Sequence, residues 1–179
     1  MNASLVVDYH LNNGIFDIKD KNINRDNCTY SIWLLKQALK NKGVELSTCD
    51  ITPPLDSDFS LCFDLPSDSV EINPHNSYLF LFESEVIKPK SWDKEKHKQF
   101  KRVFTWNDEL VDQKKYFKFN YAHLFPENEA SMMKGVKAFN DKKLCTLISA
   151  NKIVNHPLEL YSERVRAIRW FEQNAADDF

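Results

Sequence analysis

A single glutamate stands out because it follows a long run of apolar residues. Glu83 comes directly after the segment "YLFLF" (residues 78–82), which predicts a strand buried on both faces in a parallel sheet. Open α/β sheets bind ligands beyond the carboxyl ends of their strands, so a carboxylate at this point is placed to contact a ligand. The alternative is a solvated loop residue, which is the usual situation of a glutamate.

Arg164 is the second candidate, because of its place on a predicted helix. On a helical wheel of residues 155–175 the apolar face consists of Leu158, Tyr161, Val165, Ile168 and Phe171. Arg164 falls on that face, where a cation is costly without a partner. Its position near the start of a helix suits a phosphate group. The alternatives are a side chain that extends to the surface and an ion pair with a structural carboxylate.

Other patterns that support chemistry are weak or missing. Asp93 and His97 are spaced to share one helix face, but two ligands do not make a metal site, and we predict no metal. The three glycines rule out a P-loop and a GxGxxG fingerprint, so a nucleotide would be held by other means. The four cysteines lack zinc-like spacing and are interpreted as reduced thiols.

The composition is that of a globular protein of one domain or slightly more. The chain has 179 residues, 42% of them hydrophobic, which is enough for a substantial core. The net charge of −2, with acidic and basic residues interspersed, argues against a general nucleic-acid binder. We find neither a signal peptide nor an apolar stretch long enough for a transmembrane helix, and therefore expect a cytoplasmic protein.

The elements that must position these residues alternate between strands and helices, which predicts an α/β fold with a Rossmann-like, largely parallel sheet. Strands are expected within residues 3–9, 44–51, 58–65, 78–83, 102–107 and 116–125. Helices are expected over residues 27–43, with Asn27 and Thr29 as capping residues and Gly43 as the stop, and over residues 91–100.

The polar composition of residues 126–143 marks a connector between two parts of the chain. Residues 1–125 form the first domain, and residues 144–179 begin a second one with a buried strand, "LCTLISANK", and a helix with Pro157 in its first turn. One strand and one helix cannot bury their own apolar faces. We therefore expect this helix to self-associate, to pack on other apolar surface, or to exchange rapidly with solvent.

Three separated blocks carry a resemblance to a known family. Residues 81–92 ("LFESEVIKPKSW"), 104–119 and 143–172 resemble, in the same order, segments of glycosyltransferase family 10, the α-1,3/1,4-fucosyltransferases, particularly the bacterial members. The similarity spans roughly residues 75–179. It implies a GT-B architecture, with an acceptor-side N-terminal domain and a C-terminal domain that holds GDP-fucose as the donor substrate; no cofactor is implied.

The resemblance also implies roles for individual residues. Glu83 matches the general base that takes the proton of an acceptor hydroxyl in an inverting transfer, and Arg164 matches the arginine that contacts the donor diphosphate. Asn151 matches the asparagine of an "SN" pair, which here reads Ser149-Ala150-Asn151. A base must be free of a permanent cationic partner. We therefore expect an unpaired Glu83 carboxylate, with Phe80 and Phe82 buried beneath it.

This sequence lacks the family's "FENS…G…TEK" block, which supplies most donor contacts. The resemblance therefore predicts an N-terminal fragment of a fucosyltransferase that is inactive alone. The alternatives are a non-catalytic glycan- or partner-binding α/β module and an α/β protein for another nucleotide sugar. The acceptor oligosaccharide and the linkage are not predicted.

Overall fold

The computed structural model describes residues 1–124 and 135–179. The chain divides into two compact units, Met1–Phe125 and Pro126–Phe179. The first part of the expected connector, residues 126–134, lies outside the described residues.

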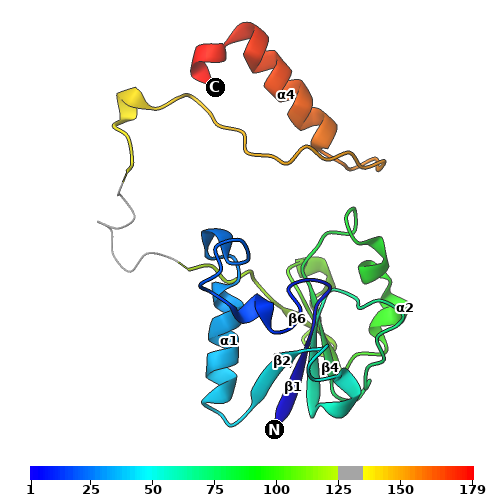
Figure 1. The fold of residues 1–179 in the computed structure, drawn as a ribbon. Coiled ribbons are helices and arrows are strands. Elements are labelled where there is room, and N and C mark those ends of the chain that lie inside the picture. The colour runs from blue at the N-terminus through cyan, green and yellow to red at the C-terminus, as the bar shows by residue number, and fades with distance from the viewer. Residues whose placement is uncertain (125–134) are drawn as a thin grey trace. The chain divides into compact units, whose positions relative to one another are not determined.

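The first unit is built on a six-stranded sheet in the order β2-β1-β3-β4-β5-β6, in which all neighbours are parallel. Its strands are β1 (Asn2–Val6), β2 (Glu45–Thr48), β3 (Phe59–Phe63), β4 (Ser77–Leu81), β5 (Arg102–Thr105) and β6 (Tyr116–Lys118). The helices α1 (Tyr30–Lys40) and α2 (Lys94–His97) lie on opposite sides of the sheet (Figure 1). The predicted α/β class with a Rossmann-like parallel sheet is confirmed.

The strand order reverses between β1 and β3. The chain leaves β1 towards β2 at one edge, and after β2 it crosses to β3 on the other side of β1. In sheets of this kind the crevice at the carboxyl ends of the two strands beside the reversal is the usual ligand site. Here those ends are followed by residues 7–9 and 64–65.

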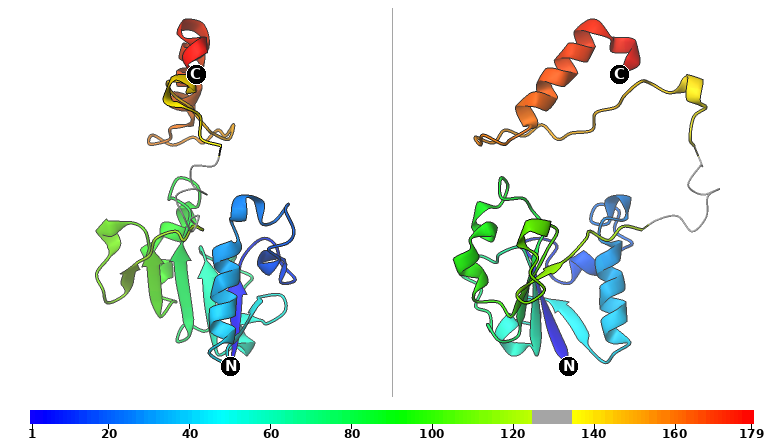
Figure 2. Two further views of the ribbon diagram at one scale, coloured as in Figure 1. Left: turned by 90° about the vertical axis from the view of Figure 1, so that its left-hand side faces the viewer. Right: turned by 180° about the vertical axis from the view of Figure 1, so that it is seen from behind.

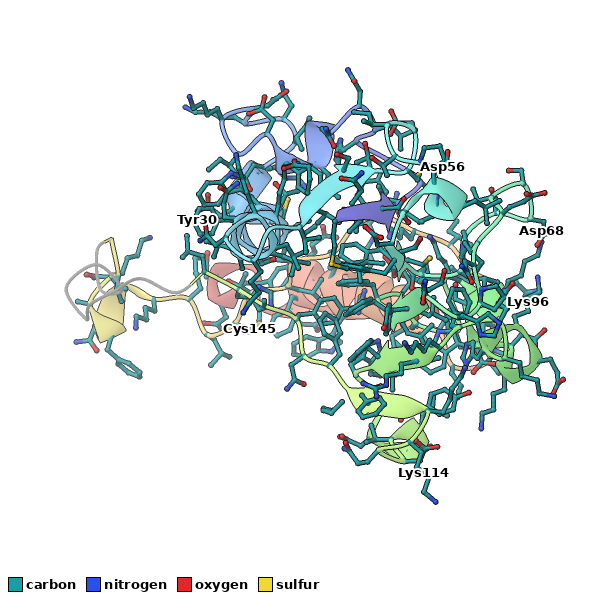
Figure 3. The ribbon with its side chains drawn as sticks, turned by 90° about the horizontal axis from the view of Figure 1, so that it is seen from below. Tyr30, Asp56, Asp68, Lys96, Lys114 and Cys145 are labelled. Carbon is teal, nitrogen blue, oxygen red and sulfur yellow. The ribbon has the colours of Figure 1, made fainter. Side chains whose placement is uncertain are left out.

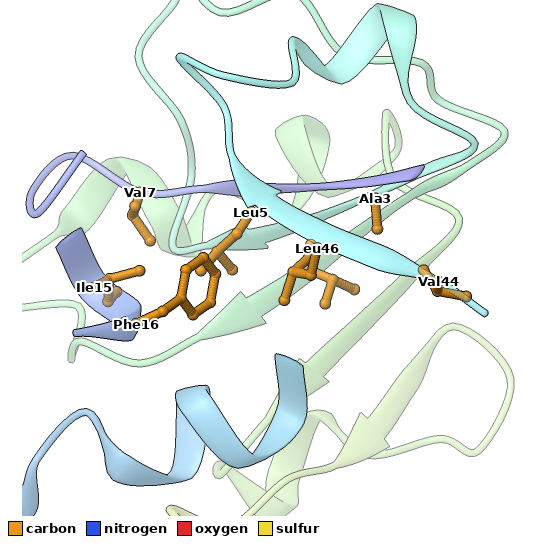
Figure 4. Close-up of a cluster of buried hydrophobic side chains, with 8 residues drawn as sticks. Ala3, Leu5, Val7, Ile15, Phe16, Val44 and Leu46 are labelled. Carbon is orange, nitrogen blue, oxygen red and sulfur yellow. The ribbon is translucent and has the colours of Figure 1, made fainter. Parts of the chain in front are cut away.

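Two separate hydrophobic cores hold the sheet, one on each face. The core beneath α1 contains Ala3, Leu5, Val7, Ile15, Phe16, Val44, Leu46 and Leu61 (Figure 4). The core on the α2 side contains Val6, Cys62, Leu79, Leu81, Phe100 and Val103. Successive strand residues point to opposite faces, so Leu5 and Val6 belong to different cores. The alternation explains how short strands fill both layers.

The helix α1 begins and ends close to the predicted residues, but its start differs in detail. Thr29 occupies the N-cap position, yet its hydroxyl donates to Asn24 Oδ1 at 3.1 Å and makes no capping bond. Asn27 belongs to the preceding 3₁₀ turn, so the prediction that it caps the helix is wrong. Gly43 follows the helix with φ +77°, a left-handed conformation that favours glycine, so it stops the helix as predicted.

The α1 side of strands β4 to β6 carries an aromatic surface. Seen from that side, α1 lies in front of β1 and β2, and the green strands beside it have no helix in front of them (Figure 2, left). Phe80 stacks on Phe104 at a centroid distance of 4.6 Å and meets Phe119 edge-on at 5.4 Å. Phe80 and Phe82 are only half-buried, so the prediction that both are buried is wrong. Burial is incomplete because α1 covers the other half of this face.

The β3–β4 and β4–β5 connections on the α2 side are held by polar contacts. Asp93 caps α2 by accepting a hydrogen bond from Glu95 N at 3.0 Å. Lys96 of α2 pairs with Asp68 of the β3–β4 connection, with Nζ 3.6 Å from Oδ1, and Figure 3 labels both at the same side of the unit. These contacts tie α2 to the loop that follows β3.

Among residues 135–179, the second unit contains one long helix, α4 (Tyr161–Asn174), and no completely buried side chain. The prediction of a buried strand over residues 144–152 is wrong: this segment forms no strand, and Ile148 is 94% exposed. A lone strand has no neighbour here to pair its backbone groups. The helix also starts later than predicted, so Leu158 and Pro157 precede it.

Within the described residues, no helix has the length and apolar character needed to cross a membrane.

Candidate functional site

Charged and phenolic side chains gather at the carboxyl edge of the first unit's sheet. Asp8 and Tyr9 follow β1, Asp64 follows β3, and Glu83 and Lys88 follow β4. These positions meet because the carboxyl ends of neighbouring parallel strands lie at one edge. Among the residues that the resemblance selects, only Glu83 lies in this group.

Lys88 is the cation of this group and is held between two carboxylates. Its Nζ lies 3.1 Å from Asp8 Oδ2 and 3.7 Å from Asp64 Oδ2, and the Asp64 side chain is 6% exposed. Burial opposes the charge of Lys88, but the hydrogen bond that Lys88 donates to Asp8 and the charge of Asp64 together raise its pKa above the ordinary value. Lys88 therefore joins the ends of β1 and β3 and is not open to an anionic ligand.

Glu83 lies two residues beyond the end of β4 and is exposed. Within residues 1–124 and 135–179, its carboxylate makes no ion pair and no hydrogen bond, so Lys88 does not neutralise it. Its backbone, in contrast, is bonded on both sides: Glu83 N donates to Asp64 Oδ1 at 3.1 Å, and Glu83 O accepts from Trp92 Nε1 at 2.9 Å. A free carboxylate is thus carried on a fixed main chain.

Three aromatic side chains from different segments surround the same main chain. Trp106 Nε1 donates to Phe82 O at 3.2 Å, and the Tyr121 hydroxyl donates to the same oxygen. The rings of Trp92 and Trp106 pack edge-to-face with centroids 5.4 Å apart. These bonds satisfy the backbone carbonyls of Phe82 and Glu83, which lie beyond the strand ladder.

The surrounding carboxylates affect the pKa values of two tyrosines in this region. Burial, followed by the negative charge of Asp64, raises the pKa of Tyr9. Burial, followed by the charges of Glu83 and Asp64, raises the pKa of Tyr121. Both phenols therefore stay protonated near neutral pH, and the Tyr121 hydroxyl donates to the carbonyl of Phe82, the residue before Glu83.

His97 is a structural residue and not a metal ligand. It is 1% exposed, with Nδ1 3.0 Å from Tyr116 Oη and Nε2 2.8 Å from Ser91 O. A carbonyl only accepts, so Nε2 carries the proton and Nδ1 accepts from the Tyr116 hydroxyl. Asp93 is used as the α2 cap, and no group of three potential metal ligands occurs in the described parts of the chain.

The buried His97 should make stability depend on pH. Burial lowers its pKa below the ordinary 6.5, and the nearby Lys115 charge acts in the same direction, while the Ser91 carbonyl opposes both. The unfolded chain therefore binds this proton at a higher pH than the folded one. Its stabilising contribution is complete above about pH 6.5 and declines as the pH falls towards the folded pKa.

We expect the melting temperature to fall between about pH 7.5 and about pH 5.5, and to fall less in His97→Gln. The exposed His75 provides the matched control, and His75→Gln should keep the full wild-type loss. The measurement is thermal unfolding by circular dichroism at both pH values. An unchanged pH dependence in His97→Gln would show that this histidine is not responsible.

The structure brings Asn151 and Arg164 together in the second unit. Both line a hollow of about 270 Å³, together with Ser149, Ala150, Lys152, Tyr161, Val165, Ile168, Arg169 and Glu172. Arg164 Nη1 lies 3.5 Å from Ser149 Oγ, and its guanidinium lies over the Tyr161 ring at 5.2 Å. Arg164 is exposed and has no carboxylate partner among the described residues. Such a hollow has the charge to hold a phosphate.

The N-terminal end of α4 is already occupied. Glu159 Oε2 accepts a hydrogen bond from Ser162 N at 3.0 Å and a further bond from Tyr161 N. The Ser162 hydroxyl also donates to this carboxylate and is the main cause of its lowered pKa. Glu159 therefore takes up two of the free amides at this helix end, which a phosphate would otherwise use. A phosphate near this helix end would be bound mainly by side chains.

A larger hollow of the first unit lies elsewhere, beside the segment that follows β2. It has a volume of about 470 Å³ and is lined by Cys49, Asp50, Pro53, Pro54, Leu55, Asp56, Ser69, Val70 and Glu71. Nearby Cys62 is buried, which raises the pKa of its thiol to about 12, so it is not a thiolate nucleophile. Neither Glu83 nor its neighbours line this hollow.

Sequence reasoning missed Asp8, Tyr9, Asp64 and Lys88. A signal for three of them was present, since Asp8, Tyr9 and Asp64 lie at the carboxyl ends of predicted strands, as Glu83 does. Lys88 had no such signal, because only folding brings its side chain to the two aspartates.

Comparison of the chain with family models, with curated proteins and with solved structures gave no match. The resemblance to the fucosyltransferases thus stays a prediction from the sequence.

Proposed function

We propose that this chain carries the acceptor side of an inverting glycosyltransferase that uses a nucleotide diphosphate sugar, with GDP-fucose as the donor that the resemblance implies. The observation that carries the proposal is the free carboxylate of Glu83. It stands on a fixed main chain at the carboxyl edge of a doubly wound sheet, without a cationic partner in the described residues. A general base needs these features.

In the proposed reaction, Glu83 accepts the proton of an acceptor sugar hydroxyl while that oxygen attacks the anomeric carbon. The bond from that carbon to the diphosphate breaks, and GDP leaves with the electron pair. Arg164 and Asn151 are proposed to bind the diphosphate, whose negative charge grows in the transition state. The sugar inverts its configuration because attack and departure occur on opposite faces.

The donor side in residues 1–179 is incomplete, since the family's "FENS…G…TEK" block is missing from them. With respect to the described residues, the hollow around Arg164 has one unpaired arginine, as Arg169 pairs with Glu172 at 2.6 Å. One arginine and a few neighbours cannot enclose a nucleotide. We therefore expect this chain to bind an acceptor sugar and to bind GDP weakly or not at all.

Titration of the ¹⁵N-labelled chain with N-acetyllactosamine to about 10 mM tests this proposal by NMR, since carbohydrate dissociation constants near 1 mM correspond to only about −4 kcal/mol. The indole signals of Trp92 and Trp106 and the amide signal of Glu83 should shift. GDP should cause no shift that saturates at micromolar concentration. Maltose is the control sugar.

Two results would contradict the proposal. The first is the absence of any shift with N-acetyllactosamine and with further neutral oligosaccharides. The second is saturable GDP binding at micromolar concentration, which would show a complete donor site.

The second candidate function is a glycan-binding module without catalysis. The Trp92–Trp106 pair favours it, because half-buried indoles beside polar groups are suited to a sugar ring. Both candidates predict sugar binding. They differ in catalysis: only the first candidate predicts sugar transfer that depends on Glu83, and the Glu83→Gln experiment distinguishes the two.

A further inference from the structure

Asp64 is a buried carboxylate in a place where burial is costly. It follows β3 directly, is 5% exposed, and has a left-handed backbone with φ 59°. Non-glycine residues rarely adopt that conformation, although aspartate tolerates it better than most. A charge and a strained backbone together need a compensating set of contacts.

Those contacts are made to the main chain that carries Glu83. Asp64 Oδ1 accepts hydrogen bonds from Phe82 N at 2.8 Å and from Glu83 N at 3.1 Å. The other oxygen, Oδ2, lies 3.7 Å from Lys88 Nζ. β4 ends at Leu81, so these two amides lie beyond its ladder and take their acceptor from Asp64.

The carbonyls of the same two residues are bonded by Trp92, Trp106 and Tyr121, as described above. Asp64 thus completes a main-chain clamp on residues 82–83. It supplies the single oxygen that accepts from both amides of that clamp.

We infer that Asp64 is a positioning residue that fixes the Glu83 carboxylate for contact with the acceptor sugar. The inference rests on the proposed function. A reacting group that is misplaced by about 1 Å loses about 10² in rate, so an exposed base needs a rigid main chain. Asp64 acts only through Glu83 and does not itself touch the sugar.

Amide hydrogen exchange of the 179-residue chain tests the clamp without reference to function. In Asp64→Ala the amides of Phe82 and Glu83 should exchange at least about 10-fold faster, while Leu79 in the ladder stays protected. Asp64→Asn keeps an oxygen acceptor and should preserve protection at both amides. Wild-type protection at Glu83 in Asp64→Ala overturns the inference, and so does loss of protection at Glu83 in Asp64→Asn.

A double-mutant cycle on N-acetyllactosamine binding then tests positioning. Asp64→Ala should weaken binding about 5- to 10-fold, Asp64→Asn should bind nearly as the wild type does, and Asp64→Ala should add nothing in a Glu83→Ala background. Additive losses would mean a merely structural role and would overturn the inference. If Asp64→Ala fails to fold, Asp64→Asn alone decides: wild-type binding supports the inference and a loss overturns it.

The two possible failures are distinguishable. If the wild-type chain binds no saccharide, the proposed function fails and positioning fails with it, whatever the exchange experiment gives. If the wild type binds saccharide and the Asp64 losses are additive, only the inference about Asp64 fails.

Discussion

Glu83→Gln is expected to lower fucosyl transfer by about 10²- to 10⁴-fold, the usual contribution of a positioned general base. The assay needs a polypeptide in which residue 179 is followed by a complete donor domain. Glutamine has the size of glutamate but cannot take up the acceptor proton. The fold and GDP-fucose binding should be unchanged, because the Glu83 carboxylate makes no hydrogen bond and no ion pair within residues 1–124 and 135–179. The readout is transfer of labelled fucose, together with GDP-fucose affinity.

Glu85→Gln is the matched control, since Glu85 lies two residues later, is also exposed, and sits in a turn. It should transfer fucose at nearly the wild-type rate. Equal losses in both variants would point to a general electrostatic effect. Transfer at nearly the wild-type rate by Glu83→Gln would assign the base to another residue, and sugar binding without any transfer would favour the glycan-binding module.

The strands of the first unit were predictable because short apolar segments mark them. The run Leu79–Phe82 marks β4, and apolar residues mark each of its neighbours. The prediction of a strand at residues 144–152 was wrong for a physical reason. A strand is stable only when another strand pairs its backbone, and the sequence of Ile148 and its neighbours holds no information about that partner.

The candidate site was predictable only in part. Glu83 follows from the rule that ligands bind beyond the strand ends, and Asp64 obeys the same rule. Its role does not follow, since a sequence cannot show that the Asp64 carboxylate meets the Phe82 and Glu83 amides. The partial exposure of Phe80 could not be predicted from the sequence either, because it depends on how far α1 extends over the sheet.

Leu79→Ala should lower the free energy of unfolding of this chain by about 2–5 kcal/mol, the cost of truncating a buried leucine in a core that cannot collapse. Leu79 is completely buried in the middle of β4, where it pairs with Cys62 on one side and Val103 on the other. Its side chain packs in the α2-side core, which also contains Phe100. Such a loss is a large fraction of the stability of a typical domain.

Urea unfolding followed by tryptophan fluorescence measures this change, and Leu34→Ala is the control. Leu34 lies on α1 and is 45% exposed, so its truncation should change stability by about 0.5 kcal/mol or less. A loss below about 1 kcal/mol in Leu79→Ala would mean that β4 is not the rigid centre of the sheet. Glu83 would then be held less firmly as well, because the clamp of Asp64 keeps residues 82–83 in place only if the strand that precedes them is itself fixed.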